Sequence, residues 1–252
     1  MGQVASAVRQ CTGLKPRTKK SKDHNEFVTV LVVGDSNVGK TTLIDNYLEE
    51  HTDPGSKEES APLSPAPKNT DALRQKSANQ LFRIKGESFS IRISLVEVNG
   101  SMDVSQKCIR DSYYKTADIV FIIYSVDKVD SLYHAEHVWY KEIVNSVGKD
   151  VKRGKEMQIV MVGVNPEARD KLEESDVYSP DREDENEELF RRNTMKKSIR
   201  RGEGERVSQR LKHANSQRET RHFEVKKERT NVIDFFHTVV QDYVMQRAEE
   251  QR

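Results

Sequence analysis

A nine-residue stretch, GDSNVGKTT at Gly34–Thr42, constrains this chain more than any other part of its sequence. It fits the pattern G-x-x-x-x-G-K-S/T, whose backbone N–H groups bind the phosphates of a nucleotide at the start of a helix. The apolar run FVTVLVV precedes it and helical periodicity follows Lys40, as such a loop requires. A chance match is the alternative, and this strand-before, helix-after context makes it less favoured.

Apolar runs and helical patterns alternate along the rest of the chain. Strands are predicted, besides Phe27–Val33, for a hairpin over Leu81–Val98 turning at Gly86, for Asp118–Val126 and for Met157–Val164. Helices are predicted after Lys40 and over Ser131–Val147, Glu205–Ala214 and Asn231–Arg247. The last helix should bury one face, made of Val232, Phe235, Phe236, Val239, Val240 and Tyr243. This order predicts an α/β fold with a mostly parallel sheet and flanking helices. The phosphate-loop motif indicates the P-loop NTPase type.

Composition indicates long solvated segments around this core. Charged residues make up 33% of the chain and apolar residues 35%, against about 25% and 45–50% in average domains. We expect a flexible tail at 1–25, a long mobile loop at 51–79, a charged insertion at about 168–204 and a short tail at 248–252, with the domain itself at 26–247. Acidic and basic blocks abut within the insertion, so a short helix is the alternative to disorder there.

The net charge, the number of cysteines and the length of the apolar runs argue against several classes of protein. The net charge of +1 gives no indication of nucleic-acid binding. Two cysteines cannot form a disulfide framework, which is typical of a reducing, intracellular environment. No apolar run reaches 18 residues, so no membrane-spanning helix is predicted. Cys108 lies in a further helix, predicted after Gly100, and is expected to serve packing.

Beyond the loop, three further segments match one protein family. These are YYKTADIVFIIYSVDKVDSL at Tyr113–Leu132, the spacing S-L-x6-W-x2-E-I around Trp139, and the closing NVIDFF helix. From Phe27 to about Gln246 the chain resembles a small GTPase of the Ras superfamily, nearest to the Rab branch. The resemblance implies a P-loop NTPase fold of the G-domain type, with about six strands in its sheet. It also implies binding of GTP or GDP with Mg²⁺, together with protein effectors and regulators.

The resemblance also assigns site residues. Those implied to bind nucleotide are Gly34, Asp35, Ser36, Asn37, Val38, Gly39, Lys40, Thr41, Thr42, Gly100, Asn165 and Glu167. Lys40 would reach the β- and γ-phosphates. Thr41 and Glu97 would hold Mg²⁺.

The chain departs from the family after the third strand. Small GTPases have D-T-A-G-Q where this chain has EVNGS at Glu97–Ser101. Glu97 keeps the negative charge on a longer side chain, and Gly100 is retained. Ser101 takes the place of the glutamine that orients the attacking water and is too short for that role, so slow hydrolysis is expected. The switch threonine has no clear counterpart, Thr70 being the nearest candidate.

The base-reading motif N-K-x-D departs further. VNPE occupies its place, which puts Asn165 at the lysine and Glu167 at the aspartate. The usual S-A-K is replaced by Val225–Lys227. Glu167 would accept hydrogen bonds from guanine only if its loop retreats by a methylene, so reduced guanine selectivity is expected.

The N-terminus predicts attachment to a membrane. M-G-Q-V-A-S fits the myristoylation pattern M-G-x-x-x-S/T at Gly2. Cys11 is a candidate for palmitoylation, and a basic cluster over 15–22 supplies another signal, since one myristoyl chain binds only marginally. The expected location is cytoplasmic, peripheral on the cytosolic face of a membrane. An ordinary polar tail with a fortuitous spacing is the alternative.

Three functions fit these residues. The first is a membrane-associated GTP-binding switch in signalling or vesicle trafficking, with slow GTPase activity. The second is a pseudo-GTPase that keeps the fold as an interaction platform. The third, phosphotransferase chemistry, has only the loop in its favour. No histidine is assigned a catalytic role, and His134 and His137 are expected to serve surface or packing functions.

Overall fold

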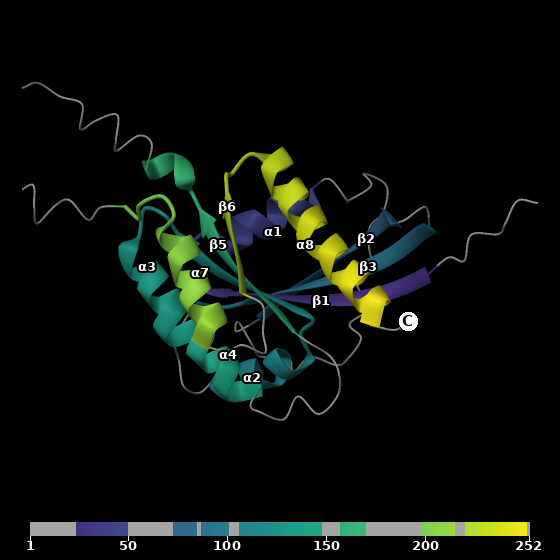
Figure 1. Ribbon diagram of the computed structural model, residues 1–252, viewed down its shortest axis with the longest axis horizontal. Coiled ribbons are helices and arrows are strands. Elements are labelled where there is room, and N and C mark those ends of the chain that lie inside the picture. Colours follow the sequence, from purple (N-terminus) through teal and green to yellow (C-terminus); the bar gives the residue numbers. More distant parts are fainter. Residues whose placement is uncertain are drawn as a thin grey trace, which may run out of the picture.

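The computed structural model describes residues 24–49, 73–84, 87–100, 106–147, 157–169, 198–214 and 220–250. Its centre is a six-stranded sheet in the order β2-β3-β1-β4-β5-β6 (Figure 1). The strands are β1 (His24–Gly34), β2 (Leu73–Ile84), β3 (Glu87–Val98), β4 (Ile119–Ser125), β5 (Gln158–Val164) and β6 (Thr220–Val225). Only β2 runs antiparallel to its neighbour, while β1 pairs in parallel with both β3 and β4. The predicted α/β fold with a mostly parallel sheet is confirmed.

Helices cover both faces of the sheet, as crossover connections between parallel strands require (Figure 1). One face carries α1 (Lys40–Leu48) and α8 (Arg229–Glu250). The other carries α2 (Lys107–Thr116), α3 (Val129–His134), the π-helical turn η2 (Ala135–Trp139), α4 (Tyr140–Val147) and α7 (Glu203–Ala214). The single helix predicted over Ser131–Val147 is therefore interrupted by a π-turn.

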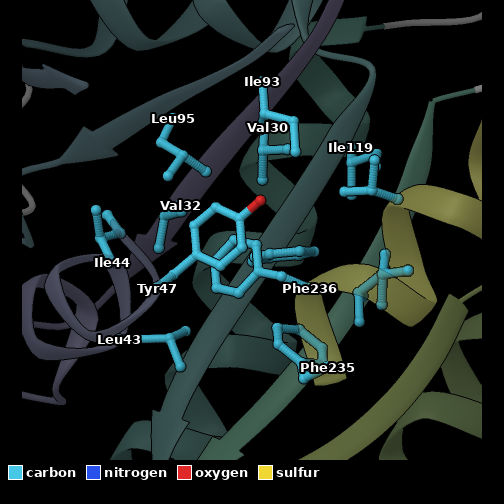
Figure 2. Close-up of a cluster of buried hydrophobic side chains, with 14 of the residues drawn as sticks. Val30, Val32, Leu43, Ile44, Tyr47, Ile93, Leu95, Ile119, Phe235 and Phe236 are labelled. Atoms are coloured by element: carbon cyan, nitrogen blue, oxygen red, sulfur yellow. The ribbon is translucent and has the colours of Figure 1, made fainter. Parts of the chain in front are cut away.

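Alternate residues of β1 point into two different cores. Val30 and Val32 face α1 and α8, while Leu31 and Val33 face the other helices, and all four are fully buried. In the first core the rings of Tyr47 and Phe236 stack with centroids 4.1 Å apart (Figure 2). The six residues predicted to form the buried face of α8 all lie in this core, so that prediction is confirmed.

Several predicted boundaries were wrong. β2 begins at Leu73, so the segment expected as a loop over 51–79 ends in regular strand. His24 and Asn25, expected in the flexible tail, pair with β3 at the start of β1. At the end of the expected insertion, Ile199 is buried and α7 begins at Glu203. Each error has the same cause: hydrogen bonding or packing extends an element beyond its apolar run.

Two remaining observations concern the surface. Cys108 is exposed on α2, so the expectation that it serves packing was wrong. Among the helices that the structure describes, none is both long and apolar enough to cross a lipid bilayer.

Candidate functional site: a phosphate loop and an adjoining pocket

The loop between β1 and α1 has backbone angles that its sequence permits. Gly34 has φ 143° and Gly39 has φ 104°, both in the region that favours glycine. A Cβ at Gly34 would lie 2.2 Å from the carbonyl oxygen of Ile123 in β4, so the loop leaves the sheet where only glycine fits. Asn37, with φ 59°, completes the turn. The chain therefore reaches the N-terminus of α1 at Lys40, as a phosphate-binding loop does.

Lys40 lies inside this loop. Its side chain is nearly buried, and Nζ donates to the carbonyl oxygens of Gly34 at 3.0 Å and Asp35 at 2.7 Å. Burial lowers the pKa of the Lys40 ammonium, and the negative charges of Glu97 and Asp35 offset part of that effect. A phosphate group here would favour the charged ammonium further, so the position suits an anionic ligand.

The two predicted magnesium ligands are in contact. The Thr41 hydroxyl donates to Glu97 Oε1 at 2.5 Å, across 56 residues of sequence. Within the described part of the chain, no group of three or more His, Cys, Asp or Glu side chains that could cage a metal is present. One hydroxyl and one carboxylate fit Mg²⁺, because this ion usually takes its other ligands from water and substrate phosphates.

Gly100 lies directly against the phosphate loop. A Cβ on it would stand 2.2 Å from the backbone nitrogen of Ser36 and 2.3 Å from the carbonyl carbon of Asp35. No other residue type fits this approach without moving one of the two backbones. The segment after β3 and the loop after β1 thus meet at this glycine, as the predicted site requires.

Asp35 anchors the loop to the helix that follows β4. Its carboxylate accepts a hydrogen bond from Trp139 Nε1 at 2.8 Å and lies 2.7 Å from His134 Nδ1. An ionised carboxylate only accepts, so the histidine ring is the donor. The Asp35 side chain therefore binds protein, and a ligand would meet only its backbone.

A pocket of about 210 Å³ adjoins the loop. It is lined by Asn37, Val38, Gly39, Thr42, Leu43, Asn46, Val164, Asn165, Val225, Lys226, Lys227 and Val232. The pocket lies between the phosphate loop and two other segments, one at the end of β5 and one at the end of β6. These are the segments expected to contact the base of the nucleotide. Asn46 Nδ2 donates to the carbonyl of Lys227 at 3.0 Å and holds one wall in place.

Asn165 and Glu167 are placed differently from each other. Asn165 lines the pocket with φ 61°, and its Nδ2 donates to Ser125 Oγ at 2.9 Å. Glu167 is not among the lining residues. Its Oε2 is buried and has no hydrogen-bond partner among the described residues, and the same holds for Asn165 Oδ1. Unpaired buried oxygens are costly, which suits groups that accept hydrogen bonds from a ligand.

Sequence reasoning did not identify His134 as part of the site, and some predicted site residues lie outside the described parts of the chain. His134, assigned to surface or packing, in fact binds the phosphate loop through Asp35. No local pattern signals this contact, which joins residues 99 positions apart. Four predicted positions lie outside the described residues: Gly2, Cys11, Thr70 and Ser101.

Comparison with known proteins agrees with this geometry. The family profile described as Ras of Complex, Roc, domain of DAPkinase matches residues 29–164, which is more than half of the chain. The chain belongs to this Roc family of Ras-like domains. Membership of the Ras superfamily, predicted from the motifs, is thereby confirmed.

The chain is also similar to a curated protein. This relative is the GTP-binding protein RHO4 of Saccharomyces cerevisiae, with which the chain shares 29% identity over 128 residues. The match covers 50% of this chain and 37% of the relative, so the chain spans well under half of the relative's length.

Proposed function

We propose that this chain is a Ras/Rab-like small GTP-binding protein whose phosphate loop holds GTP or GDP together with Mg²⁺. The convergence of Lys40, the Thr41–Glu97 pair and Gly100 on one loop carries the proposal, because α1 and the end of β3 bring them together there and each fits a polyphosphate. The similarity to a protein described as GTP-binding adds support. Bound Mg²⁺ would neutralise phosphate charge; the protein's own groups position the nucleotide.

Hydrolysis of GTP to GDP and phosphate is expected to be slow. At the position of the water-orienting glutamine the chain has Ser101, which lacks the reach to hold a nucleophilic water. Catalysis of this reaction depends mostly on positioning. We expect an intrinsic rate below that of Ras, about 4 × 10⁻⁴ s⁻¹. Ser101→Gln is expected to raise the rate without changing the affinity for GDP.

Guanine selectivity is expected to depend on Glu167. Its buried, unpaired Oε2 supports a role as acceptor for N–H groups of guanine, a pairing that adenine does not offer. The glutamate does not line the pocket, so reaching a base requires movement of the loop after β5. Selectivity weaker than in other small GTPases follows from that cost.

The remaining parts of the proposal rest on sequence. Myristoylation of Gly2, palmitoylation of Cys11 and the basic cluster would hold the protein on the cytosolic face of a membrane. There it would act through effectors and regulators in signalling or trafficking.

A pseudo-GTPase that serves as an interaction platform is the second candidate. The observation that favours it is the simultaneous loss of the glutamine and of the N-K-x-D motif. Such a protein would keep the fold and bind nucleotide permanently or not at all.

One experiment separates these functions. Purified protein is denatured and the released nucleotide is identified by anion-exchange chromatography, with Lys40→Ala as the matched control. Stoichiometric GDP or GTP in the native protein, lost in the control and replaced when labelled GTP is added, supports the switch. Bound nucleotide that never exchanges with labelled GTP supports the platform. ATP would show that the base pocket selects adenine. An empty site in protein that also gives no heat with GTP in calorimetry would leave the platform.

A further inference from the structure

The loop that joins β4 to α3 is held in one conformation by its own hydrogen bonds. The Lys128 amide donates to the Ser125 carbonyl at 3.0 Å. The Ser131 hydroxyl accepts from the Ser125 amide at 3.0 Å and donates to the Lys128 carbonyl at 2.6 Å. Ser131 is buried, so water does not compete strongly for these bonds. The backbone of Lys128 is therefore fixed at the start of α3.

The side chain of Lys128 extends from this loop to the phosphate loop. Its Nζ donates to the carbonyl oxygen of Asn37 at 2.8 Å, although the two residues are 91 positions apart. Asn37 belongs to the phosphate loop and also lines the adjoining pocket. The Lys128 ammonium thus lies where the phosphate side of the site meets the pocket.

Asn165 supplies no cation at this edge of the pocket. It occupies the lysine position of the family's base-reading motif, but it carries no charge and its amide donates to Ser125 Oγ. Ser125 in turn donates to Asp127 Oδ1. Asn165 therefore braces the loop that presents Lys128, whose ammonium lies beside the pocket residue Asn37.

We propose that Lys128 is a nucleotide-binding residue that contacts the sugar of the bound nucleotide while it holds the Asn37 carbonyl. An ammonium has three N–H donors, and the Asn37 carbonyl takes one of them. A nucleotide with its phosphates in the loop and its base in the pocket passes its sugar across Asn37, and sugar oxygens are acceptors. This inference rests on the proposed function and adds a residue to its site.

The test measures displacement of a fluorescent GDP analogue by unlabelled GDP and by inorganic pyrophosphate, which probes the phosphate loop alone. Lys128→Met is expected to weaken GDP binding about tenfold, the loss of one charge-assisted hydrogen bond. Its affinity for pyrophosphate should stay within about twofold of the wild type. Lys128→Arg should recover most of the GDP affinity, because it keeps donors at this position. Lys141→Met, which removes an exposed lysine from α4, is the matched control and should change neither value.

Two results would overturn the inference. GDP affinity of Lys128→Met within twofold of the wild type would remove Lys128 from the site. An equal loss of GDP and pyrophosphate affinity would show that the lysine acts only on the conformation of the loop. Wild-type protein that binds neither fluorescent nor unlabelled GDP would instead refute the proposed function, so the two failures are distinguishable.

Discussion

The carboxylate of Asp35 binds the indole N–H of Trp139, and Trp139→Phe removes that donor while keeping an aromatic ring in place. The indole is 1% exposed and its Nε1 lies 2.8 Å from Asp35 Oδ1. A hydrogen bond to a charged acceptor contributes about 1.5–3 kcal/mol. The smaller ring adds a cavity cost of about 1 kcal/mol. The free energy of unfolding should therefore fall by roughly 3 kcal/mol.

The assay is urea unfolding of a double-mutant cycle made of Trp139→Phe, Asp35→Ala and the double variant. In the Asp35→Ala background, Trp139→Phe should cost only its cavity term. The coupling free energy should be about 2 kcal/mol, a shift of about 1 M in the urea midpoint between the two backgrounds. The dissociation rate of GDP should rise in Trp139→Phe, because the Asp35 backbone that receives Lys40 is less firmly held.

A neighbouring residue supplies the control. Tyr140→Phe removes a hydroxyl that donates to the Leu211 carbonyl at 3.2 Å, a neutral bond remote from the loop. It should cost about 1 kcal/mol and leave GDP dissociation unchanged. A coupling below about 0.5 kcal/mol between Trp139 and Asp35, or equal GDP dissociation rates in the two phenylalanine variants, would refute the reasoning.

Two further substitutions test the sheet and its pH dependence. Gly34→Ala should destabilise the fold by at least about 3 kcal/mol, since its Cβ would meet the backbone of Ile123; an unchanged urea midpoint would contradict this. His222 Nε2 lies 2.8 Å from the Tyr124 hydroxyl, and burial lowers the pKa of His222. The unfolded chain therefore takes up a proton more readily, so stability is complete above about pH 6.5 and falls as the pH drops through the folded pKa. Unfolding measured from pH 7.5 to 5 should show a steeper loss in the wild type than in His222→Gln, and parallel curves would exclude the effect.

The sequence predicts the central strands well because each is an apolar run buried on both faces. β4 and β5 are buried at every position, and a continuous apolar run of this length is typical of a strand inside a parallel sheet. β2 was only partly predicted for the opposite reason. It is an edge strand, and from Leu73 to Gln80 its sequence LRQKSANQ is mostly polar. Pairing with β3, and not apolar content, makes this segment a strand.

The candidate site also has a part that the sequence predicts and a part that it does not. The phosphate loop is predictable because its residues are adjacent in sequence and glycine is required at fixed places. Lys128 and His134 were not predicted, since their contacts with the loop join residues 91 and 99 positions apart. Both residues follow β4, and the crossover connection brings them to the carboxyl end of the sheet beside the loop. Only the tertiary arrangement gives them a role.

The contacts of Asp35 couple the phosphate loop to the helix after β4 and to the segment after β3. Its carbonyl accepts a hydrogen bond from Lys40 and its carboxylate accepts one from Trp139. Its peptide lies against Gly100. A shift of the backbone at this residue disturbs all three contacts, since the backbones of Asp35 and Gly100 approach too closely for even a Cβ at Gly100 to fit. A ligand that displaces Lys40 from the carbonyl therefore acts on the helix after β4 and on the segment after β3 together. Changes in either place should alter nucleotide affinity, even where the substituted side chain touches no nucleotide.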